Sequence, residues 1–163
     1  MRQITSLKHF AALLGAAAIL AAPTVSLAGE EHLEFKLITR GVDVKSVNAP
    51  NIEGRMLGAG NFFGVAFFKD GRIAAKEFID EFDYLKADGT GRGYSTYTFE
   101  DGSTITASYV YEEKGGKLHG DYTILSGTGR YDKATGTGGF DSLPTKWPGG
   151  TYLFDAKFDV KTP

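Results

Sequence analysis

Hydrophobic and polar residues alternate along several stretches of the chain, which is the pattern of half-buried β-strands. In residues 32–38, Leu33, Phe35 and Leu37 fall on one face of an extended chain, and charged residues fall between them on the other face. The same period of two occurs in residues 118–125 and 152–160. We therefore predict three strands here, each with one face in an apolar core.

Residues 62–68 are apolar at both odd and even positions, and the run stops just before Asp70-Gly71. A strand that is covered on both faces has this composition. Between Gly41 and Gly60 the alternation weakens and turn residues become frequent. We therefore expect a loop there, with at most short strands.

Residues 72–86 fit either a helix or a strand. Their apolar residues also fit one face of a helix, and the Ala, Lys and Glu residues among them favour helix. The strand is favoured because Asp-Gly pairs at 70–71 and 88–89 flank the segment, as in an antiparallel meander. A strand would carry a carboxylate within a row of aromatic residues, formed by Phe78, Asp80, Phe82 and Tyr84. A helix would instead expose Asp80 to solvent.

The clearest hairpin signal lies between residues 94–99 and 103–111, which are rich in Thr and Tyr and flank an Asp-Gly pair at 101–102. Asp-Gly suits a two-residue type I′ turn, because both central residues of that turn need positive φ. A two-residue turn at this point pairs Tyr94 with Tyr109 and places both on one face of the hairpin.

Neither face of this hairpin is aliphatic, as the wall of a dry core would be. A mixture of Tyr and Thr suits a cavity that stacks against a ligand and forms hydrogen bonds with it. The alternative is ordinary strand propensity on a solvated outer face. The candidate ligand-binding residues are Tyr94, Tyr109, Tyr111 and Tyr122.

About six to eight such strands predict an all-β fold, and we expect a small antiparallel β-barrel of about eight strands with a central cavity. A barrel is favoured over a sandwich because it leaves no exposed sheet edge. The chain has no Cys, so its stability must come from packing, for which 12 Phe and 8 Tyr are present.

Residues 1–28 have the layout of a secretory signal peptide that is cleaved. Basic residues precede the apolar run 10–22, and small residues end at Ala28. A membrane anchor is the alternative, but the run is shorter than the roughly 20 residues that span a bilayer. We therefore expect a secreted or periplasmic protein without stable membrane insertion, in which residues 29–163 form a single barrel domain.

Charge argues against nucleic acid as a partner. The chain has 18 basic and 20 acidic residues, and the predicted signal peptide holds two of the basic residues, Arg2 and Lys8, and no acidic one. The mature chain therefore has a net charge of −4. A nucleic-acid-binding protein would need a clustered basic surface.

Several turn motifs resemble those of allene oxide cyclases, plant dirigent proteins and similar bacterial proteins. The most characteristic is Gly-Thr-Gly at 127–129, followed by Tyr131 and then by Ala-Thr-Gly at 134–136. The motifs in residues 82–84 and 91–103 are also similar. The resemblance implies an eight-stranded antiparallel barrel with a central cavity, commonly oligomeric. It further implies interior polar and acidic residues that steer cyclisation or coupling of a reactive small molecule.

Asp80 is the candidate catalytic residue. Between Phe78 and Phe82 its carboxylate would be desolvated and its pKa raised, which makes a carboxylic acid useful near neutral pH. The alternative is a structural ion pair with Lys76 or Arg72 on the same strand face.

The sequence gives little support for a phosphate-binding loop, a metal centre or a bound cofactor. The Gly-Thr-Gly segment at 127–129 lacks the Lys-Ser/Thr ending of a phosphate-binding loop, so a turn between strands is the better interpretation. After processing only His32 and His119 remain, far apart and without a thiol, and His119 is expected to be exposed. The sequence therefore predicts neither a metal centre nor a bound cofactor.

We expect an exported barrel that binds a hydrophobic or aromatic small molecule, with isomerase, cyclase or coupling-guide activity as an open possibility. The alternative is a non-catalytic scaffold at the cell envelope or outside the cell. Homo-oligomerisation is a further expectation. Only one face of a barrel wall is interior, so the outward aromatic residues of the segment 62–68 would form an exposed apolar patch unless a neighbouring subunit or a folded-over loop covers them.

Overall fold

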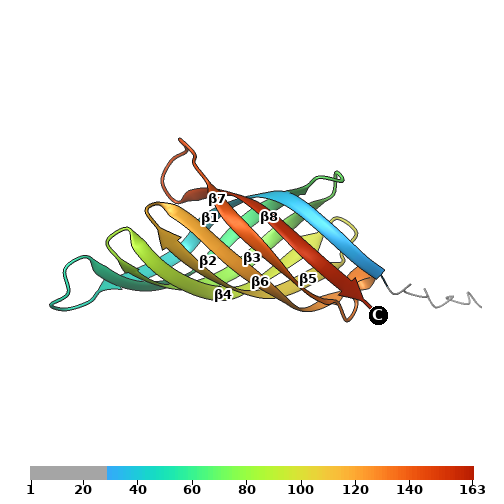
Figure 1. The fold of residues 1–163 in the computed structure, drawn as a ribbon, viewed down its shortest axis with the longest axis horizontal. Coiled ribbons are helices and arrows are strands. Elements are labelled where there is room, and N and C mark those ends of the chain that lie inside the picture. Colours follow the sequence, from blue (N-terminus) through green and yellow to red (C-terminus); the bar gives the residue numbers. More distant parts are fainter. Residues whose placement is uncertain (1–28) are drawn as a thin grey trace, which may run out of the picture.

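The computed structural model describes residues 29–163 as a closed antiparallel barrel in which each strand pairs with the next and β8 pairs with β1 (Figure 1). The strands are β1 (Gly29–Asn48), β2 (Arg55–Phe68), β3 (Ile73–Leu85), β4 (Asp88–Phe99), β5 (Thr104–Lys114), β6 (Lys117–Thr128), β7 (Thr135–Leu143) and β8 (Thr151–Thr162). A 3₁₀ helix, η1 (Gly129–Tyr131), follows β6. The all-β barrel predicted from the alternation is confirmed. The predicted signal peptide lies outside the described residues.

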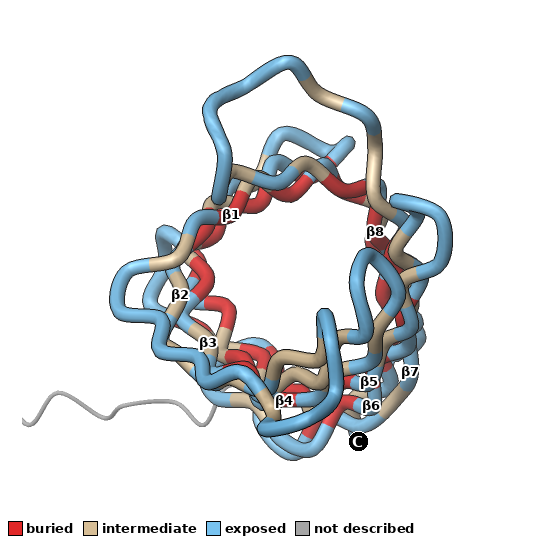
Figure 2. Tube along the Cα trace, turned by 90° about the vertical axis from the view of Figure 1, so that its left-hand side faces the viewer, coloured by how far each residue is buried: buried red, intermediate tan, exposed pale blue. Residues whose placement is uncertain are grey.

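Alternate residues of every strand face the interior, as the pleat requires. Figure 2, which looks along the barrel from the end where a long hairpin projects, shows buried positions recurring around the ring of strands. The predicted inward faces of residues 32–38 and 118–125 are confirmed, since Leu33, Phe35 and Leu37 are buried in the first and Tyr122 and Ile124 in the second.

One end of the barrel is closed by a packed core. The buried side chains there include Leu33, Phe99 and Ile105. The Arg72 guanidinium donates hydrogen bonds to the Tyr131 hydroxyl at 2.5 Å and to Glu31 Oε1 at 2.5 Å, which ties the turn before β3 to η1 and β1. This network lies at the opposite end from the projecting hairpin.

Interior glycines make room for aromatic rings on the neighbouring strand. A Cβ added at Gly91 would clash with the Tyr111 ring, because the two residues are direct partners and the ring lies over the glycine. The same arrangement recurs in the pairs Gly58 and Phe82, Gly89 and Tyr84, Gly93 and Tyr109, Gly120 and Phe140, and Gly138 and Phe158. Aromatic rings therefore lie along the wall, which leaves space at the barrel axis.

The register predicted for the β4–β5 hairpin was wrong by one residue. Tyr94 pairs with Ser108, and Tyr109 pairs with Gly93. The loop has three residues between Phe99 and Ser103, whose backbone N–H and C=O are joined at 2.9 Å, and Gly102 adopts a left-handed φ of +80°. This is a turn followed by a glycine bulge, and the extra residue moves Tyr94 to the outer face.

The expected loop between Gly41 and Gly60 is instead the long β1–β2 hairpin, which projects at the left of Figure 1. Its pairing extends from Asn48 and Met56 to the body of the barrel, with a bulge at Val42. Both faces of its outer part contact solvent, so no alternation marks it.

Residues 72–86 form a strand, as favoured, with the predicted aromatic row facing inward. The turn after it was placed wrongly: Leu85 pairs with Asp88, so the turn is Lys86-Ala87 and Asp88 already begins β4. Lys86 has a φ of +61°.

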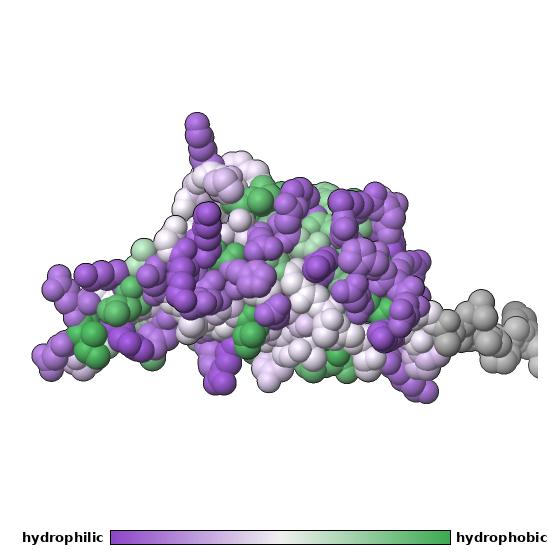
Figure 3. All heavy atoms as spheres, viewed as in Figure 1, coloured by the Kyte–Doolittle hydropathy of each residue, from purple (hydrophilic) through white to green (hydrophobic). Residues whose placement is uncertain are grey.

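Within residues 29–163 no other segment covers the outer face of residues 62–68, so the single chain does not bury this strand on both sides, and cover by a second subunit stays a prediction. Phe63 and Phe67 point outward and are 44% and 45% exposed. Apolar residues are also exposed on the projecting hairpin, at the left of Figure 3, among them Val47 and Leu57. Within residues 29–163 there is no helix that is long and apolar enough to cross a membrane.

Candidate functional site

The barrel encloses a cavity of about 460 Å³ on the side of the projecting hairpin. Its mouth is bordered by Lys86, Glu113 and Gly150, at the ends of the β3–β4, β5–β6 and β7–β8 hairpins. Aromatic residues from six strands line the wall: Phe62, Phe78, Phe82, Tyr84, Tyr109, Tyr111, Tyr122, Phe140, Tyr152 and Phe154.

Strand β3 crosses the full depth of the cavity. Residues 76, 78, 80, 82 and 84 face inward in turn. Because the chain rises about 3.3 Å per residue, Lys76 and Asp80 stand about 13 Å apart along the strand, with Phe78 between them. Lys76 lies toward the closed end and Tyr84 toward the mouth.

Asp80 is 9% exposed and is held by two tyrosines of β5. The Tyr111 hydroxyl donates to Oδ2 at 2.9 Å. The Tyr109 hydroxyl lies 3.1 Å from Oδ1 and 2.8 Å from the carbonyl oxygen of Ile79, so these two acceptors share its proton. Burial raises the pKa of Asp80 to about 6, although the tyrosine hydrogen bonds and the charge of Lys76 oppose this shift.

The expected desolvation of Asp80 is therefore present, and the alternative of a structural ion pair is not. Among the described residues, neither Lys76 nor Arg72 approaches Asp80 within ion-pair distance, since Arg72 binds Asp70 and Glu31. The acid titrates near neutral pH inside an aromatic cavity, where a ligand can reach it.

Lys76 is the residue that sequence reasoning missed, because it was considered only as a partner for Asp80. It is 4% exposed, and its Nζ donates to the Tyr122 hydroxyl at 3.0 Å. The Nζ also lies 4.2 Å from the centre of the Phe78 ring. Burial lowers the pKa of Lys76 to about 7, against a smaller opposing effect of Asp80. Its place in the same alternation as Asp80 was the signal that could have revealed it.

Three of the four predicted ligand-binding tyrosines line the cavity, namely Tyr109, Tyr111 and Tyr122. Tyr94 does not, since it is 57% exposed on the outer wall as a result of the register. Burial raises the pKa of Tyr109 and Tyr111 well above the usual range, so both remain hydrogen-bond donors at any physiological pH.

Polar contacts hold the mouth of the cavity. The Tyr84 hydroxyl donates to Glu113 Oε2 at 2.6 Å, and burial raises the pKa of Tyr84. Arg55 pairs with Asp83 just outside, which joins β2 to β3. These links span adjacent or next-adjacent strands and fix the shape of the entrance.

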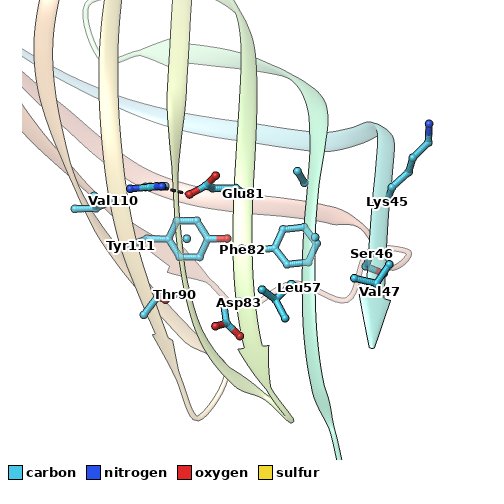
Figure 4. Close-up of a pocket in the computed structure, with 14 residues that line it drawn as sticks. Lys45, Ser46, Val47, Leu57, Glu81, Phe82, Asp83, Thr90, Val110 and Tyr111 are labelled. Carbon is cyan, nitrogen blue, oxygen red and sulfur yellow. Dashed lines mark hydrogen bonds and ion pairs between the residues drawn. The ribbon is translucent and has the colours of Figure 1, made fainter. Parts of the chain in front are cut away.

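A second hollow lies on the outer wall over β1 to β5, with a volume of about 710 Å³ (Figure 4). Leu57, Glu81 and Val110 contribute to its lining, and Phe82 and Tyr111 line both this hollow and the inner cavity. Figure 4 shows Glu81 in an ion pair, and its partner is Arg92. This hollow contains no buried charged group comparable to Asp80 or Lys76.

Within residues 29–163, no group of three or more His, Asp or Glu side chains is arranged to hold a metal ion. His32 pairs with Asp159 at 2.5 Å, and the exposed His119 pairs with Asp141 at 2.7 Å. Both histidines therefore belong to the outer surface.

Comparison with known proteins shows the fold. No protein-family model and no curated protein matches the chain. The pterocarpan synthase dirigent protein GePTS1 is similar in structure, with a TM-score of 0.54 and 15% identity over 90% of this chain and 98% of that one. The pterocarpan synthase dirigent protein PsPTS1 has a TM-score of 0.53 and 15% identity over 82% and 95% of the two chains.

A third similar structure is that of a protein of unknown function from the DUF3224 family of Shewanella oneidensis MR-1. It has a TM-score of 0.51 and 12% identity over 84% of this chain and 99% of that one. The chain therefore has the fold of a dirigent-like barrel, in agreement with the part of the resemblance that concerns dirigent proteins.

Proposed function

We propose that the barrel binds a hydrophobic or aromatic small molecule in its inner cavity. The observation that carries this proposal is the cavity of about 460 Å³, lined by aromatic rings and holding one buried carboxylate. Binding sites for small molecules commonly have about 300 to 1,000 Å³ of space and a few placed polar groups in an apolar wall. The cavity has both properties.

Asp80 is the group that would act on the bound molecule. With a pKa of about 6 it can donate or accept a proton near neutral pH. Two neutral phenols hold its orientation, so a ligand above Phe78 and Phe82 would meet a fixed carboxyl group. Proton transfer of this kind serves an isomerisation, a cyclisation or the guided coupling of a reactive intermediate.

The structural neighbours support this proposal by their fold and by their names, since two of them are named as pterocarpan synthases. A likeness to allene oxide cyclases, which the same turn motifs suggest, belongs to this proposal as well. So does export to the periplasm or the outside of the cell, where the ligand would be encountered.

The test is to identify what the cavity holds. The protein is purified from its own host, and small molecules extracted from it are identified by mass spectrometry. Two variants on the same strand separate the two hollows: Met56→Trp fills the mouth of the inner cavity, and Leu57→Trp fills the outer hollow. We expect the extracted molecule to be lost from Met56→Trp and retained in Leu57→Trp.

Loss from Leu57→Trp alone would place the ligand on the outer wall and contradict the proposal. Recovery of no small molecule from any form, together with no binding of added phenols or lipids in calorimetry, would favour the non-catalytic scaffold. The exposed Phe63 and Phe67 are the surface such a scaffold would use.

A further inference from the structure

Lys76 is a buried cation that the proposed role of Asp80 does not use. Its Nζ lies at the deep end of the cavity, and among the described residues no carboxylate lies within 4.0 Å of it. Within residues 29–163 its one hydrogen-bond partner is the Tyr122 hydroxyl, at 3.0 Å. Burying an ammonium without a counter-ion costs free energy. Such a lysine therefore either destabilises the fold or acts chemically as a neutral amine.

Four aromatic rings lie close to this amine. The ring centres of Phe78, Tyr97, Tyr109 and Tyr122 lie 4.2, 5.3, 5.2 and 5.2 Å from Nζ. Lys76 also lines the cavity, so a reacting group that enters the cavity can approach the amine from there. A flat aromatic molecule that enters from the mouth would reach Nζ with its leading end.

We propose that the Lys76 amine is a nucleophile that forms an imine with an aromatic aldehyde or ketone bound in the cavity. This inference rests on the proposed function, since it requires that the cavity accept a small molecule, and it names the chemical class of that molecule.

The step balances without an oxidant or reductant. The amine lone pair attacks the carbonyl carbon, the C=O π electrons move to oxygen, and a proton from nitrogen passes to that oxygen to form a carbinolamine. The carbinolamine then loses its hydroxyl group and the second nitrogen proton together as water, and the nitrogen lone pair forms the C=N bond. Hydrolysis reverses both steps and releases the ligand.

Tyr122 is placed to carry the protons of this exchange. Its hydroxyl lies 3.0 Å from Nζ and 3.0 Å from the hydroxyl of Tyr97, so a proton can pass between amine, Tyr122 and Tyr97. Burial raises the pKa of Tyr122 and of Tyr97, which keeps both hydroxyls protonated. We therefore assign Tyr122 as a positioning and proton-relay residue for Lys76.

The protonation state of Lys76 supports the same conclusion. Burial lowers its pKa to about 7, so a substantial fraction is neutral amine at neutral pH, whereas an ordinary lysine is almost fully charged. The titratable groups that face it are the phenols of Tyr97, Tyr109 and Tyr122 on β4, β5 and β6, and Asp80 farther along β3. Of these only Asp80 ionises below pH 8.

The experiment is reductive trapping with 4-hydroxybenzaldehyde and sodium cyanoborohydride, followed by peptide mapping of modified lysines. We expect a single dominant adduct on Lys76 in wild type, at least about tenfold faster than on any surface lysine at pH 7. The rate at Lys76 should level off above about pH 7, while surface lysines continue to gain reactivity beyond pH 9. Lys76→Met should lose the adduct, and Tyr122→Phe should retain it but form it several-fold more slowly.

Two non-reacting probes distinguish failure of this inference from failure of the proposed function. If 4-hydroxybenzyl alcohol or 4-hydroxybenzoate binds in calorimetry and Met56→Trp abolishes the binding, the cavity takes small molecules. Labelling that is spread over surface lysines, with Lys76 unmodified, would then overturn the imine alone. If no probe binds and no adduct forms, both proposals fail. Binding of the benzoate only, lost in Lys76→Met, would show that Lys76 pairs with an anion and would also overturn the imine.

Discussion

At the scale of single residues, Asp80 sits between two opposing influences. Burial disfavours its charge, while the hydroxyls of Tyr109 and Tyr111 and the charge of Lys76 favour it. The pKa near 6 means that burial prevails. The carboxyl group is therefore less stable as an anion in the folded protein than in water.

This balance predicts the effect of Asp80→Asn. The folded-state pKa is above the unfolded value of about 4, so wild type loses stability as the pH rises from about 4 to about 6 and keeps that loss above pH 6. The neutral amide does not suffer this loss. We expect the free energy of unfolding of Asp80→Asn, relative to wild type, to increase by roughly 1 to 3 kcal/mol between pH 4 and pH 7.

Urea unfolding of both proteins at several pH values measures this difference, and Asp121→Asn on the exposed face of β6 is the matched control. A difference that stays constant from pH 4 to pH 7 would contradict the raised pKa. Proton transfer to a bound ligand should fall in Asp80→Asn while binding is kept.

Tyr111→Phe removes a hydrogen bond that favours the charged form of Asp80. The pKa of Asp80 should therefore rise further, by roughly one unit, which is the usual worth of such a bond. Nuclear magnetic resonance titration of the labelled carboxyl carbon reports it directly. Tyr94→Phe, on the outer wall, should leave the titration unchanged. An equal shift of the Asp80 pKa in both variants would contradict a specific effect of the Tyr111 hydrogen bond.

The sequence predicted the inward orientation of Asp80 and its desolvation, because two aromatic neighbours at i−2 and i+2 share its face in any strand. It did not predict the tyrosines that hold it. They lie about 30 residues away on β5. A one-residue error in the register assigns every β5 residue the wrong partner on β4. Alternation also placed Lys76 on the same face as Asp80, but it does not show depth in a barrel, so Lys76 was considered only as a partner for Asp80.

At the scale of strands and hairpins, the loop at residues 100–102 shows that a local turn motif does not determine the register of a hairpin. Asp-Gly is favoured in a two-residue turn and also in a three-residue loop with a glycine bulge, and the two differ in register by one. The side chain of Asp101 accepts hydrogen bonds from the backbone and hydroxyl of Ser103, which stabilises the longer loop. That choice depends on packing inside the barrel, where Tyr97 and Ile105 must both face the core.

The glycines under aromatic rings give a prediction for the wall itself. Gly91→Ala forces the Tyr111 ring off the wall and strains its bond to Asp80. We expect a loss of about 1 to 3 kcal/mol in the free energy of unfolding, as for other overpacked sites. Thermal and urea unfolding test this, with Gly149→Ala as the control, since a Cβ there meets nothing within 4 Å. Equal stability of the two variants would show that the ring is free to move.

At the scale of the whole molecule, the sequence predicted that the barrel closes, but it did not predict that the two ends of the barrel differ. Alternation in residues 32–38 and 152–160 identified the two closing strands, which pair from Gly29 and Thr162 to Arg40 and Thr151. The hairpin beyond Gly41 has solvent on both faces, so its sequence carries no period, and only pairing between its two strands defines it. The cavity lies at that end because the opposite end is filled by the packed core and the Arg72 network.

The charge of the buried lysine should appear in the stability of the entire barrel. The folded-state pKa of Lys76 is about 7 and its unfolded value is about 10.5, so between these values the unfolded chain holds a proton that the folded protein lacks. Wild type should therefore gain stability as the pH rises from 7 toward 10, with a slope that approaches about 1.4 kcal/mol per pH unit.

Lys76→Met keeps the side-chain volume and removes the buried charge. Proteins often tolerate the replacement of a buried charged residue by an apolar residue of similar volume. Its advantage over wild type should be greatest below pH 7, where wild type must bury an ammonium, and should shrink as the pH rises toward about 10.5, because the folded wild type then buries a neutral amine. Urea unfolding at pH 6, 8 and 10 measures the difference in free energy of unfolding between the variant and wild type. For Lys157→Met, on the outer face of β8, this difference should not change with pH. A flat difference for Lys76→Met as well would mean that Lys76 stays fully charged in the folded barrel, and the amine could then not act as a nucleophile at neutral pH.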